Sequence, residues 1–285
     1  MLNPNDLPFL GAGLGYRSPI HDQITAHVDD LDWLELFTDQ FLPLTGERRE
    51  RLGRLSAGWR CVPHGLELSV GGDAREDDGY LDQVAKVVAA LDAPWFSDHL
   101  CFSDAGGVRL GHFAPLPWTR EAALRVAERA RRAQDHVGRP LLLENITYEF
   151  SLGGDLTEAQ FIETVVDNAG CGLLLDVTNV HTNAVNHGFD AVAFLDAIPL
   201  ERVVQLHVAG GRRVDGRLLD SHDSPVPEEV WELVDHVTAR APVRGILVER
   251  DDLFPADFGE LLGEVGRARS ALAGAGGVTA GRDRR

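Results

Sequence analysis

The sequence predicts a single α/β domain with the architecture of a (β/α)8 barrel. Three observations carry this prediction: eight short apolar runs, helical patterns between them, and a regular alternation of the two along most of the 285 residues. Alternating strands and helices indicate a parallel sheet, and eight repeats are the number that closes it into a barrel. Most doubly wound open sheets use fewer strands.

The eight runs have the composition of strands that are buried on both faces. Several are nearly continuous stretches of Leu, Val and Ile, which is typical of parallel sheets covered by helices. We expect the strands within residues 9–16, 33–37, 61–70, 95–100, 140–145, 171–179, 203–210 and 245–250.

Helical patterns fill the intervals between these runs. The strongest lie at 77–92, 119–138, 156–170 and 227–240, where apolar residues recur at helical spacing. The second begins with Thr119 and ends at Gly138, residue types that favour the start and the end of a helix. Weaker patterns predict further helices at 22–31, 47–57, 189–197 and 255–273.

No linker divides the chain, so we expect one barrel domain over residues 1–273. The segment 274–285 is rich in Gly and Ala and then basic, and we expect it to be disordered. The segment GAGLG at 11–15 lacks the glycine spacing of a dinucleotide site. It predicts a tight strand-to-loop turn and no nucleotide cofactor.

Charge and cysteine content restrict the class of protein. The formal net charge is -18, with 45 acidic against 27 basic residues, which disfavours binding to nucleic-acid phosphates. No apolar run of about 18 residues and no secretory signal pattern is present, so we expect a cytoplasmic protein without membrane contact. Cys61, Cys101 and Cys171 are far apart, and we expect them to be buried and unpaired.

Six consecutive strands end in an imidazole or a carboxylate. Because the carboxyl ends of the strands form the mouth of a barrel, these side chains should meet there. The side chains are His64, His99 (after Asp98), Glu144 with Asn145, Asp176 with Asn179, His207, and Glu249 with Asp251 and Asp252. Burying so many charges together is costly unless cations lie between them. Imidazoles and carboxylates without thiolates favour iron, manganese or zinc, and do not separate iron from zinc.

The stretch LDSHDSP at 219–225 adds two further candidates, Asp220 and His222. In an extended segment, residues two apart point to the same side, so both can reach one point. A solvated turn is the alternative, since Asp, Ser and Pro are common turn residues. The donors on the neighbouring strands favour a site.

Eight motifs in order resemble the multinuclear non-heme iron oxidative enzymes, the family that includes the methanobactin-biosynthesis iron enzyme. They are PHGLELSVGG, SDHLCF, APLPWTREAAL, LLLENITYEF, LLLDVTNVHTNAVNHGFD, QLHVAG, LLDSHDSPVPEEVWEL and ILVERDD, and the match runs from about residue 10 to residue 260. The family is in turn similar to xylose-isomerase-like TIM barrels, including an endonuclease that uses three zinc ions.

The resemblance implies a set of metal ligands and catalytic residues. His64, His99 and Glu144 would bind one iron, and Glu144 would bridge to a second iron held by Asp176, His207 and Glu249. Asn179, Asp220 and His222 would surround a third, more weakly bound iron, and Glu35 would support the ligands. The resemblance places catalysis on Glu144, Asp176, His207 and Asp220.

The sequence departs from the family pattern at three places. Asp39-Gln40-Phe41 stands where the family has E-N-F, Thr178 stands in its D-V-N-N motif, and Gly211 replaces a frequent His after A-G. The ligand positions are retained, so these departures concern the loops that select the substrate.

The resemblance implies an enzyme that uses two or three iron ions, Fe(II) and Fe(III) together, and O2 to modify a ribosomally made precursor peptide, often at Cys. A small partner protein that binds the leader peptide is common in the family. The alternative is a zinc- or manganese-dependent hydrolase or phosphodiesterase on the same side chains. A sugar isomerase would normally use a Lys or His for ring opening, and the single lysine, Lys86, lies within a predicted helix. A further alternative is a non-catalytic scaffold that is stabilised by metal and binds a partner. Of these alternatives it agrees least well with an open mouth rich in charged residues.

Overall fold

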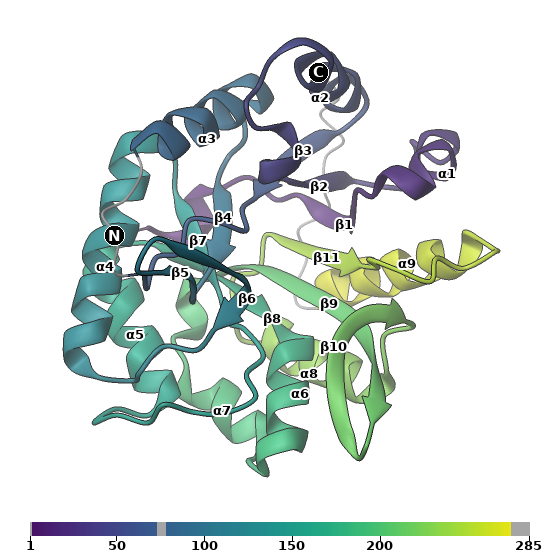
Figure 1. Ribbon diagram of the computed structural model, residues 1–285. Helices are drawn as coiled ribbons and strands as arrows, with labels where there is room; N and C mark the ends of the chain where they lie inside the picture. Colours follow the sequence, from purple (N-terminus) through teal and green to yellow (C-terminus); the bar gives the residue numbers. More distant parts are fainter. Residues whose placement is uncertain (1, 73–77, 275–285) are drawn as a thin grey trace.

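The computed structural model describes residues 2–72 and 78–274. Within them, eight parallel strands form a closed barrel, as the sequence predicts (Figure 1). These strands are β1 (Gly11–Gly15), β2 (Trp33–Phe37), β3 (Arg60–His64), β4 (Phe96–His99), β7 (Leu141–Glu144), β8 (Gly172–Asp176), β9 (Val203–Val214) and β11 (Gly245–Glu249). Each pairs with the next, and β11 returns to β1, which closes the ring.

Helices surround the barrel and bury their apolar faces against it. They are α1 (His21–Ala26), α2 (Gly46–Gly58), α3 (Asp78–Leu91), α4 (Arg120–Val137), α5 (Glu158–Ala169), α6 (Val177–His187), α7 (Ala191–Ala197), α8 (Glu228–Thr238) and α9 (Gly259–Gly274). Short 3-10 turns lie at Pro4–Asp6, Ser18–Ile20, Thr38–Phe41 and Leu200–Arg202. None of these helices, in the part of the chain described, has the length and apolar character needed to cross a bilayer.

The predicted caps are present where the helical signals are strongest. The Thr119 hydroxyl accepts a hydrogen bond from the backbone N–H of Ala122, and Gly138 ends α4 in the left-handed conformation. Residue 77 and the predicted tail at 275–285 lie outside the described residues, and Gly274 is the last residue of α9.

Helix α6 is not predicted from the sequence. The strand expected over 171–179 ends at Asp176, and α6 begins at the next residue. The Asp176 carboxylate accepts a hydrogen bond from the N–H of Asn179 at 2.7 Å and so caps a helix that starts at Val177. This cap outweighs the β-branched residues that favour continuing the strand.

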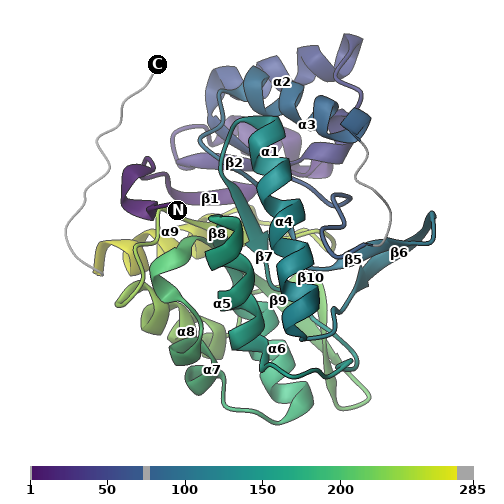
Figure 2. The ribbon, with the colours of Figure 1, turned by 90° about the vertical axis from the view of Figure 1, so that its left-hand side faces the viewer.

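Two hairpins beside the barrel mouth were also not predicted. One joins β5 (Phe102–Ala105) to β6 (Val108–Ala114), and the other extends β9 and joins it to β10 (Arg217–Ser224). The turn of the second is Asp215-Gly216, both with positive φ, a sequence that favours tight hairpins. Figure 2 shows both hairpins on the same side of the molecule, where the strands end. The LDSHDSP stretch therefore lies in and just beyond β10 and not in a free loop.

An apolar layer fills the end of the barrel opposite the mouth. It consists of Leu10, Trp33, Val62, Trp95, Leu142, Leu174, Val204 and Leu247. All are at most 6% exposed. This layer closes the barrel interior from below, so polar groups above it can be reached only from the mouth.

Candidate metal centre

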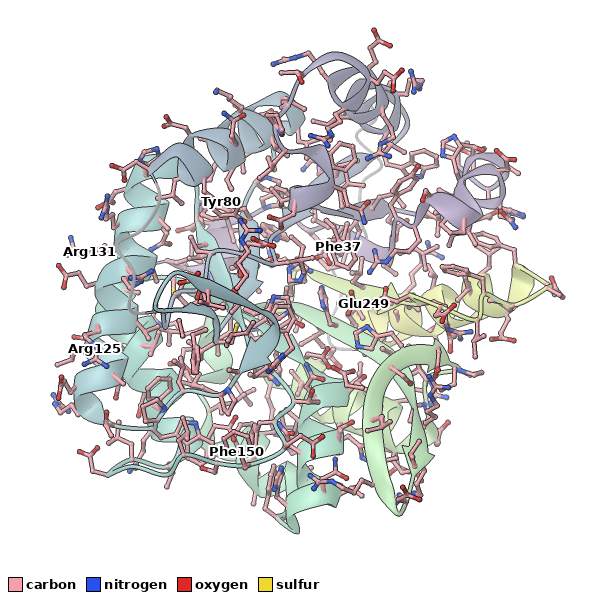
Figure 3. All side chains as sticks on the ribbon, in the orientation of Figure 1. Phe37, Tyr80, Arg125, Arg131, Phe150 and Glu249 are labelled. Atoms are coloured by element: carbon pink, nitrogen blue, oxygen red, sulfur yellow. The ribbon has the colours of Figure 1, made fainter. Side chains whose placement is uncertain are left out.

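Five strands place a donor side chain directly above the apolar layer. In each, the donor follows a layer residue by two positions: Trp33 and Glu35, Val62 and His64, Leu142 and Glu144, Leu174 and Asp176, Leu247 and Glu249. Side chains two apart on a strand point to the same side, so all five donors point into the barrel. Each is at most 4% exposed. Figure 3 shows Glu249 at the carboxyl end of β11.

His64, His99 and Glu144 form the first group of converging donors. One atom from each lies within 4.8 Å of the others. Glu144 Oε2 is 3.3 Å from His64 Nε2 and 3.4 Å from His99 Nε2. This set provides two neutral nitrogens and one oxygen, which suits a first-row transition metal.

The two imidazoles of this group are held through their other nitrogen. His64 Nδ1 lies 2.9 Å from the Ser97 hydroxyl, and His99 Nδ1 donates to the carbonyl of Gly65 at 3.2 Å. Phe113 stacks on the His99 ring at 3.7 Å. Burial lowers the pKa of His64 well below its usual value and that of His99 to about 3. Both rings are therefore neutral at pH 7, with Nε2 directed at Glu144.

Glu144, Asp176, His207 and Glu249 form the second group. His207 Nδ1 lies 3.2 Å from Glu144 Oε1 and 3.1 Å from Glu249 Oε2. Glu144 thus directs Oε2 to the first group and Oε1 to the second. A carboxylate shared in this way can bridge two cations.

Glu35 orients His207 from the side away from the second group. Its Oε2 lies 3.1 Å from His207 Nε2 and accepts a hydrogen bond from Gln205 Nε2 at 2.6 Å. Gln205 in turn accepts from the indole N–H of Trp95 at 2.8 Å. A carboxylate that accepts from the outer nitrogen of a ligating histidine fixes its tautomer and raises its basicity.

The Glu35→Gln substitution is expected to weaken cation binding at the second group by about 10- to 100-fold, because an uncharged amide no longer raises the basicity of His207 as a carboxylate does. The first group, which Glu35 does not contact in the described hydrogen bonds, should retain its affinity. Competition with a chelator of known affinity measures both. Equal weakening of the two groups would show that Glu35 acts on the fold and not on His207.

The third group consists of His222, Glu249 and Asp251. His222 Nδ1 lies 3.7 Å from Glu249 Oε2 and 3.4 Å from Asp251 Oδ2. Its other nitrogen, Nε2, lies 2.6 Å from Asp220 Oδ1, so Asp220 and His222 do converge as their spacing predicts.

The third group shares His222 with the expected set of Asn179, Asp220 and His222, which remains a prediction. Asp251 takes part in the third group, and Asp220 faces the opposite edge of the His222 ring. Asn179 is 4% exposed, and its amide donates to the carbonyl of Asn145 at 3.0 Å. Its Oδ1 is buried without a hydrogen-bond partner among the described residues, which leaves its lone pairs available to a cation.

Unpartnered polar atoms show that these residues fit cations. Glu144 Oε2, Asp176 Oδ2 and Asn179 Oδ1 are buried and have no hydrogen-bond partner in the described part of the chain. An unsatisfied buried polar atom is costly, and ligation by a cation removes the cost. Burial, together with Asp220 and Glu144, raises the pKa of Asp176 well above its usual range. Burial also raises the pKa of Glu144 to about 7. These shifts express the same crowding of negative charge.

The cysteines take no part in these groups. Cys61, Cys101 and Cys171 are all free and buried, as predicted, and burial raises the pKa of each thiol. Within the described residues, the three donor groups contain only imidazoles and carboxylates.

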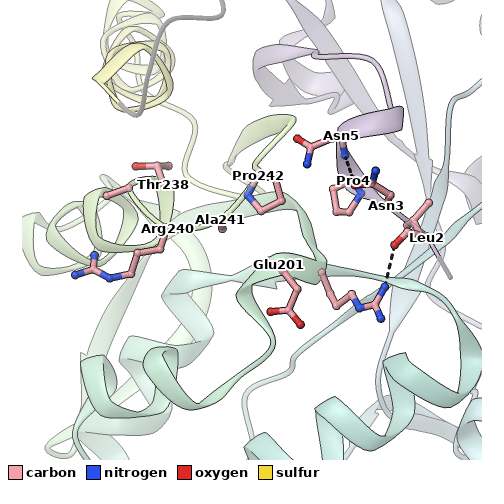
Figure 4. A pocket seen from close by; sticks show the side chains of 11 residues that line it. Leu2, Asn3, Pro4, Asn5, Glu201, Thr238, Arg240, Ala241 and Pro242 are labelled. Atoms are coloured by element: carbon pink, nitrogen blue, oxygen red, sulfur yellow. Dashed lines mark hydrogen bonds between the residues drawn. The ribbon is translucent and has the colours of Figure 1, made fainter.

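A separate pocket opens at the other end of the barrel (Figure 4). It lies between the chain before β1, the turn before β9 and the turn before β11, and Arg202 donates there to the carbonyl of Leu2 at 2.9 Å. Its lining lacks the converging imidazoles and carboxylates of the mouth. The converging imidazoles and carboxylates of the described residues thus lie at the mouth and not in this pocket.

Two UPF0276 proteins are similar to this chain in sequence. The UPF0276 protein of Streptomyces avermitilis is 40% identical over 276 residues, which are 94% of this chain and 56% of that protein. The chain thus spans little more than half of that relative. A UPF0276 protein of an Anaeromyxobacter species is 36% identical over 267 residues, 93% of this chain and 94% of the relative.

Among solved structures, D-psicose 3-epimerase from Clostridium cellulolyticum has a TM-score of 0.56 at 13% identity, covering 92% of this chain and 94% of the epimerase. Endonuclease IV from Thermus thermophilus has a TM-score of 0.56 at 19% identity, covering 94% of this chain and 100% of the endonuclease. At such identities the likeness shows the barrel fold alone.

The resemblance that the sequence motifs indicate is confirmed by a family match. The family described as RiPP precursor modification enzyme MbnB/TglH/ChrH, where RiPP denotes a ribosomally synthesised and post-translationally modified peptide, matches residues 11–273. This span includes every donor of the three groups. The chain therefore belongs to the MbnB/TglH/ChrH family of RiPP precursor modification enzymes.

Proposed function

We propose that this protein is an iron- and O2-dependent enzyme that oxidatively modifies a ribosomally synthesised precursor peptide. The observation that carries the proposal is the sharing of Glu144 between two groups of buried donors. The two groups would hold an iron pair, and the family membership supports a peptide substrate.

His64, His99 and Glu144 would hold one iron, and Glu144, Asp176, His207 and Glu249 the other. When bound, the iron pair would supply the redox chemistry that couples reduction of O2 to oxidation of the peptide. The chain orients the ligands through Ser97, Gly65 and Glu35, and the apolar layer excludes water from below. Asp220, whose side chain is 21% exposed beside His222, would accept a proton from a bound peptide.

The peptide would enter from the open mouth. Several exposed apolar side chains lie in the segments that follow the strands: Val108, Phe150, Leu152, Val214, Leu219 and Leu253. They would contact the precursor peptide, and a small leader-binding partner protein would bring the peptide to them.

The test is anaerobic purification, elemental analysis and Mössbauer spectroscopy, followed by exposure to O2 with the precursor peptide encoded beside the gene. The expected result is about two irons per chain and an O2-dependent loss or gain of mass on the peptide. Stoichiometric zinc without iron, together with hydrolysis of a phosphate ester, would instead support the metal-dependent hydrolase.

Cation binding should strengthen as the pH rises from about 6 to 8. Burial opposes protonation of His207, but Glu249, Glu35 and Glu144 hold its pKa well above the usual value. Acidic neighbours do the same for His222, and the pKa of Glu144 is about 7. The metal-free centre therefore carries protons that a cation must displace, so each proton released strengthens the apparent affinity about tenfold per pH unit. Calorimetric titration in two buffers of different ionisation enthalpy counts these protons, and binding without proton release would contradict the prediction.

A further inference from the structure

Arg17 places a buried guanidinium beside the third group. It follows β1 and is 6% exposed. Its Nε donates to Asp251 Oδ1 at 2.7 Å, and its Nη2 lies 2.6 Å from the same oxygen and 3.4 Å from Glu249 Oε1. Nη1 donates to the carbonyl of Tyr16, and the guanidinium lies 3.8 Å from the centroid of the Phe37 ring. The Arg17 guanidinium is thus held in place by contacts on several sides.

Glu249 and Asp251 each direct one carboxylate oxygen to Arg17 and the other to a histidine of the donor groups. Glu249 directs Oε1 to Arg17 and Oε2 to His207 and His222. Asp251 directs Oδ1 to Arg17 and Oδ2 to His222. Arg17 therefore neutralises two of the three residues of the third group from the side opposite His222.

We propose that the Arg17 guanidinium is the built-in cation of the third group, and that it keeps a metal ion out of this group while the first two groups are filled. The proposal rests on the metal centre of the proposed function. It assigns to Arg17 the role of a positioning residue that sets how many ions the centre holds.

The charge of the centre favours this role. Glu249 and Asp251 are the two carboxylates of the third group, and Arg17 contacts both. A divalent cation placed between them would lie close to the guanidinium, and like charges at such a distance repel each other. Without Arg17, that repulsion is absent and both carboxylates remain to hold the ion. Because an arginine stays protonated at all working pH values, the neutralisation by Arg17 is permanent.

The Arg17→Gln substitution tests the proposal. The metal-free chain is dialysed to equilibrium against a series of anaerobic Fe(II) solutions, and elemental analysis gives the ions bound per chain. Arg17→Gln should bind one ion more than the unaltered chain, with half-saturation for that ion at a free Fe(II) concentration at least about tenfold lower than in the unaltered chain. Arg17→Lys keeps the charge and should bind the same number as the unaltered chain. An unchanged or lower count in Arg17→Gln would overturn the proposal.

Two further variants locate the extra ion. Adding Asp251→Asn to Arg17→Gln should remove it, whereas adding Asp220→Asn, on the other edge of the His222 ring, should not. Asp251→Asn alone provides a test that does not depend on the folding of Arg17→Gln. It should leave the count of the unaltered chain unchanged, and loss of one ion would show that the third group already holds metal. If the unaltered chain binds fewer than two ions, the proposed function fails and not this inference alone.

Discussion

The Glu144→Gln substitution is expected to lower the metal content to at most one ion per chain and to lower peptide oxidation at least about 10³-fold. Glu144 is the residue that the first two groups share, through Oε2 and Oε1 respectively. An amide in its place keeps a single oxygen, so it cannot supply one to both groups. An amide is also neutral, and a bound cation supplies several kcal/mol of charge stabilisation to a reaction. Elemental analysis after anaerobic loading, and mass spectrometry of the peptide after O2 exposure, measure the two effects.

Glu264→Gln is the matched control for this change. Glu264 is a carboxylate on α9 that accepts a hydrogen bond from the N–H of Val226 at 2.7 Å and belongs to none of the three donor groups. It should retain the full metal content and rate. Full metal content and rate in Glu144→Gln would show that the site has been assigned to the wrong side chains.

His207→Gln is expected to lower the free energy of unfolding of the metal-free protein by about 3–5 kcal/mol. His207 is fully buried and lies within 3.2 Å of Glu35, Glu144 and Glu249. These acids raise its pKa against the effect of burial, so the ring is charged in the metal-free state. Removing it leaves buried carboxylates without their positive partner. Thermal melting should show a fall in Tm of roughly 6–15 °C.

The sign of the pH dependence provides a second check on this prediction. Since the pKa of His207 is raised in the folded state, its contribution to stability is complete below the usual histidine pKa of about 6.5 and is lost as the pH rises through the raised value. The difference in Tm between the unaltered chain and His207→Gln should therefore be larger at pH 6 than at high pH. A difference that grows with pH would contradict a charged His207.

His236→Gln is the control for His207→Gln. His236 lies on α8, where its Nε2 is 2.7 Å from Asp196 Oδ1 on the outside of the barrel. A surface pair of this kind contributes about 0–1 kcal/mol. The control should therefore melt within about 2 °C of the unaltered chain and bind the same number of ions.

The barrel could be predicted because its strands are apolar throughout. A strand that is buried on both faces needs apolar side chains at nearly every position, and runs such as WLELF and PLLLEN stand out for that reason. The two hairpins and α6 could not be recognised in this way. Their conformation depends on local hydrogen bonds, at Asp215-Gly216 and at the Asp176 cap, which a pattern of apolar residues does not report.

The donors of the first two groups could be named individually because each ends an apolar strand. Arg17 was missed for the complementary reason. The first strand ends without a histidine or a carboxylate, so its end offers no candidate ligand. Only the closing pair β1–β11 brings Arg17 to Glu249 and Asp251. An arginine directly after a barrel strand is the signal that could have indicated it.

By itself, the sequence determined the barrel, the end at which the donor side chains meet and the types of residue among them, because strand burial and the two-residue alternation of side chains are local properties of the chain. Only the tertiary structure decided how the donors divide into groups. The sharing of Glu144, the place of Asp251 in the third group and the position of Arg17 depend on distances between strands that are remote in sequence. Those distances are set by barrel closure and packing, which no single segment encodes.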